Sequence, residues 1–443
     1  MLTRAHMAAA VAVTMAAACV PTPDPPLVEP GEWLPGGDTT NTLLLGRNAF
    51  LRPAENITDD NELRFFSGNS FFNQAWVTAP ASTTARDGLG PLFNARSCAA
   101  CHPQDGRGAP PGPNDDPTNF QGLLLRITTA SGDPHPQYGG QLQPFGVGDI
   151  PGEAVQSVTY TPIAGQYDDG TPYELMQPTY AITDWAYGEP EVPVHISPRV
   201  GPQMIGLGLL DAIPDARLDE LADPDDADGD GISGERGVGR FGWRATQPSV
   251  RHQVADAFLH DLGITSPLLP TDGCTDVQPA CKAAPNGGDP EIDDDLLEKV
   301  TVYSSLGAVP IRRDWEDPGV LAGKKHFHAI GCASCHVPSH ITGAHELAEV
   351  SNQKIWPYTD LLLHDMGEEL ADDVSSQWRT PPLWGLGLVP AVNKHQQLLH
   401  DGRARGVAEA ILWHGGEAEV ARNRFRALNA QARDELVTFV NSL

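Results

Sequence analysis

The stretches Cys98-Ala99-Ala100-Cys101-His102 and Cys332-Ala333-Ser334-Cys335-His336 are two copies of one pattern, Cys-x-x-Cys-His, in a chain of 443 residues. This spacing is the attachment motif of c-type haem. Two thiols add to the two vinyl groups of one porphyrin, and the adjoining histidine binds the iron as its proximal ligand. A zinc site would need four ligands close together, and a thioredoxin-like pair needs no histidine. The sequence therefore predicts two covalently bound haem c groups.

The composition is strongly acidic. Asp and Glu number 58 against 29 Lys and Arg, which gives a formal net charge of -29. A nucleic-acid partner is excluded, because binding to phosphates requires a basic face. The acidic surface either attracts a basic electron carrier or simply keeps the exterior solvated.

The first residues read as an export signal. Arg4 precedes a short apolar run at residues 7–15, and three alanines at 16–18 precede Cys19. Such a run is too short to span a bilayer. The alanines and Cys19 resemble a lipobox, in which Cys19 is acylated, and cleavage by an ordinary signal peptidase is the alternative. We expect a periplasmic or outer-membrane lipoprotein that contacts the membrane through its lipid anchor.

The remaining chain divides into four parts. A Pro-rich tether at residues 20–40 precedes an N-terminal haem domain at 41–270, a loop and connector at 271–316, and a C-terminal haem domain at 317–443. Short β-prone runs at 122–128 and 154–160 suggest small hairpins, and apolar residues at helical spacing predict a helix over 429–443. We predict a mainly α fold with long irregular loops and a few short β-hairpins.

One internal repeat is present. Residues 202–209 (Pro-Gln-Met-Ile-Gly-Leu-Gly-Leu) parallel residues 381–388 (Pro-Pro-Leu-Trp-Gly-Leu-Gly-Leu), and an arginine, Arg199 or Arg379, lies upstream of each copy. Each copy follows a haem motif, which suggests two related halves. An accidental match of two Gly-rich segments is the alternative.

Two further cysteines remain after Cys19 and the four motif thiols are assigned. Cys274 and Cys281 lie in a stretch rich in Gly and Pro. We predict that they form a structural disulfide that closes a small surface loop.

The ligand on the distal face of each iron decides whether a haem transfers electrons or binds a small oxidant. For the second haem the favoured distal ligand is His400, which follows the repeat segment, and His364 and Met366 compete with it. All three residues also fit an ordinary structural role.

For the first haem the possible distal ligands are His195 and Met204. We hypothesise that this haem is the reactive one, with Arg199 and Glu174 as catalytic residues that polarise bound peroxide and move its proton. An arginine on a haem propionate and a glutamate at the surface are the alternatives.

An acidic stretch suggests calcium. Asp226, Asp228 and Asp230 alternate as in a calcium loop, with Glu235 as a further ligand. Gly237 stands where an EF-hand requires glutamate, so a shorter loop is expected. A solvated acidic turn is the alternative.

The chain resembles the bacterial di-haem oxidoreductases, whose members are described as peroxidases or thiol oxidoreductases. The resemblance is carried by residues 88–94 running into the first motif, by 205–214 and 228–234, and by the second motif with 383–415. More distantly, Arg379-Thr380-Pro381 and His400-Asp401-Gly402 are similar to di-haem cytochrome c peroxidases, the maturation enzyme of methylamine dehydrogenase and rubber oxygenases.

The resemblance implies two cytochrome c-like haem domains, one haem reactive toward peroxide or oxygen and the other delivering electrons to it. In the peroxidase relatives a Met or Tyr just before His-Asp-Gly ligates the electron-transfer haem, but Leu399 occupies that place here. This difference favours His400, as does the comparison with rubber oxygenases. The Gln and Glu of the peroxidase distal site are not found in register.

These expectations define a peroxidase-like di-haem enzyme. It would reduce hydrogen peroxide or a related oxidant, with electrons from a small donor protein or molecule relayed from the C-terminal haem to the N-terminal haem. A haem-dependent oxygenase acting on an organic substrate and a non-catalytic electron-transfer cytochrome are the alternatives.

Overall fold

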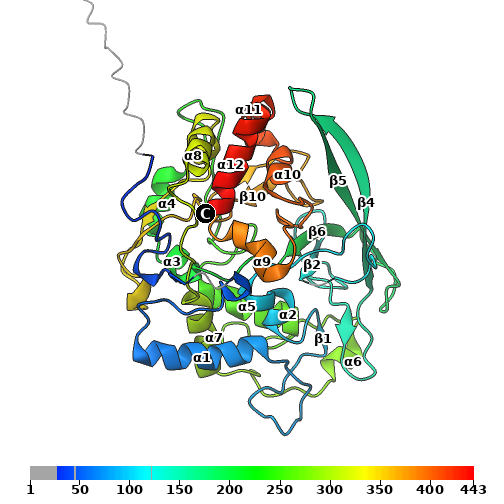
Figure 1. Ribbon diagram of the computed structural model, residues 1–443. Helices are drawn as coiled ribbons and strands as arrows, with labels where there is room; N and C mark the ends of the chain where they lie inside the picture. Colours follow the sequence, from blue (N-terminus) through cyan, green and yellow to red (C-terminus); the bar gives the residue numbers. More distant parts are fainter. Residues whose placement is uncertain (1–26, 44–45, 121) are drawn as a thin grey trace, which may run out of the picture.

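The computed structural model describes residues 27–43, 46–120 and 122–443 (Figure 1). The predicted signal peptide and Cys19 lie outside these residues. Helices hold 30% and strands 16% of the structure, and all sheets in the described part are two-stranded. The prediction of a mainly α fold is therefore right only in part: the fold mixes helices with small sheets. Within the described ranges, no helix combines the length and the apolar character needed to cross a bilayer.

The helices are mostly short and are joined by long loops, as the many Gly and Pro residues suggest. Their bounds are α1 Asp59–Asn73, α2 Cys98–Cys101, α3 Leu207–Asp211, α4 Asp215–Leu221, α5 Val250–Leu262, α6 Pro279–Lys282, α7 Asp294–Ser305, α8 Pro318–Ala329, α9 Val389–Asn393, α10 Val407–Leu412, α11 Glu419–Ala427 and α12 Ala430–Ser442.

Five antiparallel strand pairs complete the fold. They are β1 Leu92–Phe93 with β3 Phe145–Gly146, β2 Leu123–Thr128 with β6 His195–Val200, β4 Val155–Gln166 with β5 Pro172–Thr183, β7 His340–Ile341 with β8 Lys354–Ile355, and β9 Leu363–Asp365 with β10 Gln377–Arg379.

Two helix pairs have the same construction. In α1, Gly68 lies against α7 so closely that an added Cβ would overlap the carbonyl oxygen of Lys299. In α8, Gly323 meets α12 in the same way at the carbonyl of Glu435. Because only glycine permits this approach of two backbones, each pair crosses at its glycine.

An aromatic residue four positions after each of these glycines reaches a motif histidine. The ring of Phe72 lies 6.2 Å from that of His102, and the ring of Phe327 lies 6.3 Å from that of His336. Four residues are about one helical turn, so each phenylalanine emerges beside its crossing point. The two haem motifs therefore have matching surroundings.

The internal repeat also occupies matching places. Gly206 and Gly385 both adopt left-handed backbone angles directly before a short helix. Two residues further on, Gly208 packs against the end of α7 and Gly387 against the end of α12. The close approaches account for the glycines of both copies.

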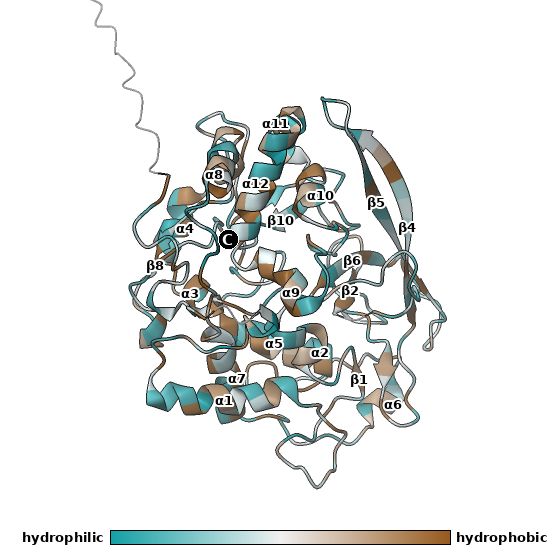
Figure 2. Ribbon diagram, in the orientation of Figure 1, coloured by the Kyte–Doolittle hydropathy of each residue, from teal (hydrophilic) through white to brown (hydrophobic). Residues whose placement is uncertain are grey.

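The hydrophobic core has two large clusters. One joins α1, α3, α5 and α7, and the other joins α8, α10, α11 and α12. The predicted C-terminal helix is confirmed as α12, which carries hydrophobic and hydrophilic patches (Figure 2) and buries Leu436 and Phe439. Asn429 caps this helix by accepting a hydrogen bond from the backbone of Ala432.

The predicted short strands are present, but the second is longer than expected. Residues 123–128 form β2, whereas 154–160 belong to a hairpin of two 12-residue strands, β4 and β5. This hairpin runs along one side of the molecule (Figure 1), and in its turn Asp169 pairs with Arg433 of α12 at 2.7 Å. The hairpin thus connects the β-rich part of the chain with the C-terminal helices.

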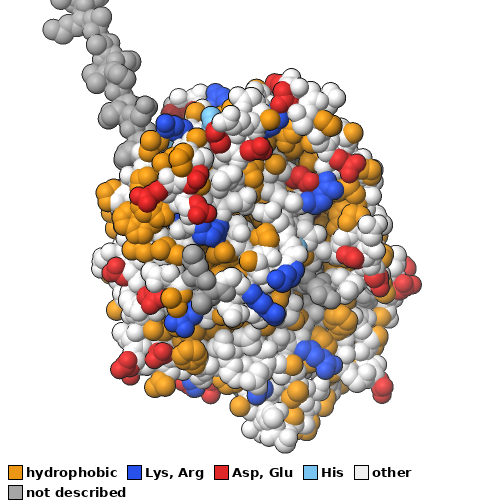
Figure 3. Space-filling model, viewed as in Figure 1, with side chains coloured by type: hydrophobic (Ala, Val, Ile, Leu, Met, Phe, Trp, Pro, Cys, Tyr) orange, Lys and Arg blue, Asp and Glu red, His pale blue; other side chains and the backbone are white. Residues whose placement is uncertain are grey.

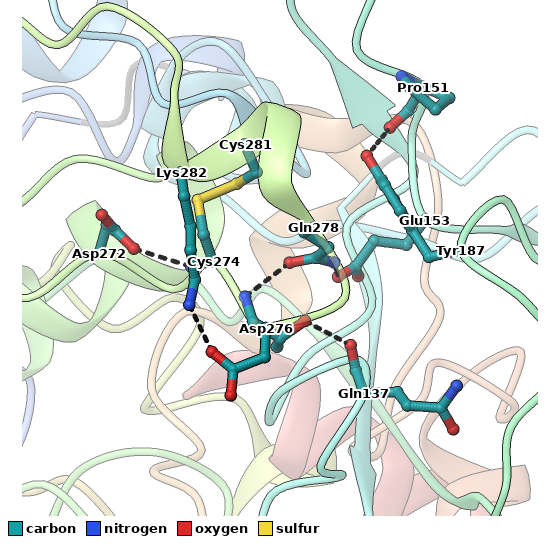
Figure 4. The surroundings of a disulfide bond; sticks show 11 residues. Gln137, Pro151, Glu153, Tyr187, Asp272, Cys274, Asp276, Gln278, Cys281 and Lys282 are labelled. Carbon is teal, nitrogen blue, oxygen red and sulfur yellow. Dashed lines mark hydrogen bonds and ion pairs between the residues drawn. A yellow bond between two sulfur atoms is a disulfide. The ribbon is translucent and has the colours of Figure 1, made fainter.

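The predicted disulfide between Cys274 and Cys281 is confirmed (Figure 4), with their Cα atoms 5.8 Å apart. The loop that it closes is tied down by Gln278, whose side chain donates a hydrogen bond to the buried carboxyl of Glu153 at 2.6 Å. The disulfide is therefore a structural bond of a packed loop.

Candidate haem-binding sites

The first motif forms the short helix α2 and places His102 directly after it. The imidazole Nδ1 of His102 lies 2.7 Å from the carbonyl oxygen of Pro202, to which it donates a hydrogen bond. This bond fixes the ring and leaves Nε2 to bind a metal, which is the arrangement that metal-ligating histidines usually show. Pro202 is the first residue of the repeat segment, so the repeat positions the proximal histidine.

The second motif has the same chemistry with a different acceptor. Nδ1 of His336 lies 3.0 Å from the carbonyl oxygen of Tyr358. The phenol of Tyr358 is buried and donates a hydrogen bond to Glu32 at 3.1 Å. Glu32 in turn pairs with the buried Arg312 and with Lys324, so a network of charged groups holds this acceptor in place.

The four motif cysteines are free thiols. Burial raises the pKa of Cys101 and of Cys332 to about 12, and it raises the pKa of Cys98 and Cys335 as well.

Burial also keeps both motif histidines neutral. It lowers the pKa of His336 to about 4 and lowers the pKa of His102. Neutral imidazole is the form that binds iron. The motif residues thus fit haem in their hydrogen bonds and in their protonation state.

A cavity of about 470 Å³ adjoins the second motif. Cys332, Cys335 and His336 line it, and its other walls are largely apolar: Phe327, Ile330, Leu383, Leu386, Leu398, Leu399, Val407, Ile411, Leu436 and Val440. Cofactor pockets combine such apolar walls with a few polar groups. The cavity therefore suits a porphyrin bound beside His336.

His400 lines this cavity and is 3% exposed. Its ring stacks on Trp378, with centroids 3.7 Å apart and an interplanar angle of 13°. Nε2 is fully buried without a hydrogen-bond partner and lies 4.0 Å from a carboxylate oxygen of Asp401. Burial lowers the pKa of His400 to about 3, so the ring is neutral.

Both nitrogens of His364 are hydrogen-bonded to carboxylates, although its ring also lies with Cys335 and Asp360 in a group whose ligand atoms are within 4.8 Å of one another. Its Nε2 lies 2.8 Å from a carboxylate oxygen of Asp360, and its Nδ1 lies 2.7 Å from one of Glu417. Burial alone would lower the pKa of His364, but hydrogen bonds to Asp360, Cys335 and Glu417 raise it to about 12. This imidazole is therefore a buried cation between two carboxylates.

A third histidine on this cavity was missed by the reasoning from sequence. His414 follows α10, and its Nδ1 lies 2.6 Å from the carbonyl oxygen of Ala410. The available signal was its place in the segment 383–415 that resembles the di-haem oxidoreductases. Met366 also borders the cavity and packs against the second core cluster.

The structure places Arg199 beside residues of the C-terminal half. Its guanidinium carbon lies 4.4 Å from the ring centroid of Trp378, and the group pairs with Asp372 at 3.3 Å. Glu174 is exposed on β5, with its carboxylate 3.9 Å from Arg405. Among the described residues, neither side chain has a hydrogen bond or ion pair with the first haem motif.

The two distal candidates for the first haem lie in different surroundings. His195 lies at the start of β6, with Nδ1 3.2 Å from the carbonyl oxygen of Asp373. Met204 packs against the first core cluster, and its backbone N–H bonds to the carbonyl oxygen of Asp105.

The acidic loop brings together a partly different set of carboxylates. Oxygens of Asp223, Asp226 and Asp228 lie within 4.8 Å of one another. Asp230 accepts a hydrogen bond from the backbone of Ile232 at 2.9 Å, and Glu235 pairs through its backbone with Leu363 of β9. Asp223 was not expected from the sequence, because it precedes the alternating pattern.

One backbone path joins the two sites. The N–H of Val200 donates to the carbonyl oxygen of His400 at 2.7 Å, two residues before Pro202 holds His102. The indole of Trp243 donates to the carbonyl of Val200 at 2.8 Å. The segment 200–202 is therefore in contact with both the first proximal histidine and the cavity of the second site.

Two Cys-x-x-Cys-His sites with matching histidine hydrogen bonds define the class of di-haem redox proteins. A family model described as "Di-haem oxidoreductase, putative peroxidase" matches residues 34–443. The chain belongs to this family, and it is a di-haem redox enzyme.

Other comparisons add little. No curated protein matches the sequence. Among solved structures, the chain is similar to hydrazine synthase of Kuenenia stuttgartiensis, in a structure pressurized with 20 bar xenon. The sequence identity is 14%, the TM-score is 0.32, and the match covers 92% of this chain and 96% of the other.

Proposed function

We propose that both haems are haem c, bound through thioether links to Cys98 and Cys101 and to Cys332 and Cys335, and that the enzyme reduces hydrogen peroxide or a related oxidant. Electrons enter at the second site and pass to the first. The observation that carries the proposal is the pair of proximal histidines, each donating Nδ1–H to a backbone carbonyl and each directly following two thiols in the chain.

The bound haems supply the one-electron chemistry and the binding of the oxidant. The protein orients the two proximal histidines and keeps water away from the second haem. Pro202 and Tyr358 fix the two imidazoles, and the apolar walls of the second cavity exclude water. Val200, hydrogen-bonded to His400 and to Trp243, forms the direct connection along which electrons cross between the sites.

We further propose that the molecule consists of two cytochrome c-like domains. The support is the repeated crossing of α1 with α7 and of α8 with α12, each with a phenylalanine directed to its motif histidine. In this division α7 belongs to the N-terminal domain, although it lies in the stretch at 271–316 that the sequence suggests as a connector.

Two more proposals concern the environment of the enzyme. We propose that the chain is exported and held at the membrane by acylation of Cys19, since covalent haem attachment and the disulfide both belong to oxidising compartments.

We also propose that the loop containing Asp223, Asp226 and Asp228 binds calcium. Isothermal titration of the chelator-treated protein with Ca²⁺ tests this proposal directly.

The proposed activity is tested with holoprotein purified after export. The fully reduced protein is mixed anaerobically with hydrogen peroxide, and haem oxidation is followed optically. We expect one peroxide to oxidise both haems, since its reduction to water consumes two electrons. A double variant, Cys98→Ala with Cys101→Ala, keeps the second haem and loses this reaction.

Other outcomes decide for the alternatives. If reduced protein binds no carbon monoxide and is not oxidised by peroxide, it is an electron-transfer cytochrome. If peroxide has no effect but carbon monoxide binds and the protein consumes oxygen in the presence of an apolar organic substrate, it is an oxygenase. Either result contradicts the proposed peroxide reduction.

A further inference from the structure

The cavity beside His336 is lined by three histidines besides the proximal one, namely His364, His400 and His414. A sixth ligand to an iron bound by His336 must offer a neutral nitrogen with open space in front of it. The hydrogen bonds and burial of each ring decide which histidine meets these two conditions.

His364 and His400 each fail one condition. Both nitrogens of His364 are hydrogen-bonded to the carboxylates of Asp360 and Glu417. The ring of His400 is stacked on Trp378, and its Nε2 is enclosed by protein atoms, without a partner and without accessible surface.

His414 meets both conditions. Its Nδ1 donates to the carbonyl of Ala410, as the proximal histidines donate to Pro202 and Tyr358. Its Nε2 makes no hydrogen bond to any described residue, and it is not among their fully buried polar atoms without a partner, so it has open space beside it. His336 and His414 also line the same cavity.

We infer that His414 is the sixth ligand of the second haem, through Nε2, and that His400 positions the cavity wall from its stack on Trp378. The inference rests on the proposed haem at His336. A haem with two histidine ligands is coordinatively saturated and exchanges electrons without binding peroxide. The ligand set thus assigns electron entry to the second site and leaves oxidant binding to the first.

The fixed carbonyl bond of His414 strengthens the assignment. A histidine ligand whose other ring nitrogen is hydrogen-bonded to the protein keeps its orientation in both oxidation states of the iron. His414 comes four positions after Ala410, just past the end of α10, so the bond is local and does not depend on distant packing.

The test compares three single variants of the holoprotein by optical and electron paramagnetic resonance spectroscopy. His414→Ala removes the proposed ligand, His414→Met replaces it with a thioether, and His400→Phe keeps the aromatic stack while removing the alternative nitrogen. Intact mass spectrometry of each variant counts its haems, which separates failure of this inference from failure of the proposed attachment.

We expect His414→Ala to convert one haem from low spin to high spin, and added imidazole to restore the low-spin signal. His414→Met gives the near-infrared charge-transfer band of His–Met coordination and a higher reduction potential. His400→Phe leaves the low-spin signal unchanged.

The inference is overturned if His400→Phe produces the high-spin haem, or if His414→Ala and His414→Met both retain the wild-type spectrum with two haems bound. If His414→Ala does not fold, His414→Met decides alone, because methionine is similar to histidine in volume and is apolar enough to remain in an apolar wall.

Discussion

At the scale of single residues, hydrogen bonding sorts the buried histidines of the second site into different roles. His336 and His414 each give one N–H to a backbone carbonyl and keep one nitrogen free, whereas His364 gives both nitrogens to carboxylates. The first arrangement produces a neutral ring that can bind metal, and the second produces a buried cation. The same amino acid thus has different chemistry within one cavity wall.

A pH-dependent contribution to stability is expected from Glu153. Burial raises the pKa of its carboxyl to about 8, despite hydrogen bonds from Gln143 and Gln278. Between the ordinary value of 4.5 and about 8, the folded state binds a proton that the unfolded state has lost. Stability therefore falls as pH rises through this window, by about 1.4 kcal/mol per pH unit at most.

The variant Glu153→Gln tests this effect, because a neutral amide of similar shape replaces the protonated carboxyl and its oxygen can still accept the hydrogen bond from the backbone N–H of Gln143. Urea unfolding at about pH 5 and about pH 8 should show the variant gaining stability relative to wild type at the higher pH. Glu316→Gln, an exposed position, serves as control. An equal difference between wild type and Glu153→Gln at both pH values would contradict the prediction.

The haem motifs and the disulfide could be predicted from the sequence, because the spacing of their cysteines and histidines indicates a specific chemistry. Cys-x-x-Cys-His specifies three residues within five consecutive positions, and Cys274 with Cys281 remained as the one pair in a Gly- and Pro-rich stretch. The hydrogen-bond acceptors of the two proximal histidines, Pro202 and Tyr358, were not predicted. Every residue has a backbone carbonyl, so the residue type does not indicate which carbonyl accepts the bond. His414 was overlooked for a related reason: a lone histidine has no spacing to mark it.

At the scale of elements, the two glycine crossings carry the strongest packing constraint. Gly68→Ala and Gly323→Ala would each place a methyl group on a backbone carbonyl of the partner helix. Although alanine favours helix by about 1 kcal/mol, overpacking of this kind costs about 3 kcal/mol, so each variant should lose about 2 kcal/mol. Chemical denaturation measures the loss.

Gly319→Ala in the first turn of α8 is the matched control. Its added Cβ would meet only the flexible side chain of Asp317, at 3.1 Å. This variant should be as stable as wild type or slightly more stable. Equal stability of all three variants would show that the helices do not cross where we place them.

The disulfide closes a loop with a sequence separation of 7. Chain-entropy estimates for so short a loop give about 2 kcal/mol of stabilisation. The double variant Cys274→Ser with Cys281→Ser should lose about this amount in urea unfolding while its haem spectra remain those of wild type. A change in the haem spectra would mean that this loop influences a haem site.

Helices and strands whose apolar residues recur at a regular spacing could be predicted from the sequence. Elements without such a regular spacing could not. Helix α12 has buried Ala432, Leu436, Phe439 and Val440 at helical spacing. The hairpin of β4 and β5 has mostly exposed residues over its outer half, so no alternation of apolar and polar residues indicates its length. Hydrogen bonding along the hairpin and the contact of its turn with α12 extend it beyond the predicted run.

At the scale of the whole molecule, the sequence suggested two halves but not their boundary. The pairing of α1 with α7 joins helices that lie more than 200 residues apart in the chain. A contact so remote has no local sequence signal, and it places α7 against the N-terminal helix. The repeat at 202–209 and 381–388 was the indication of duplication that could be read without the structure.

The net charge of -29 predicts that the rate of electron transfer from a basic donor protein depends on ionic strength. Acidic and basic side chains are interspersed on the face viewed in Figure 3, and the net negative charge of the chain attracts a basic donor protein. Reduction by a basic cytochrome c should slow markedly as ionic strength rises, because salt screens the attraction. Stopped-flow rates with an uncharged reductant serve as control and should not change.

The most direct test of the whole account is the intact mass of the exported, mature protein under denaturing conditions. The account predicts the mass of the processed polypeptide plus two haem groups, with one haem lost from a variant lacking Cys332 and Cys335. A mature protein with the mass of the bare polypeptide, or with haem that dissociates on denaturation, would contradict covalent attachment at these two motifs.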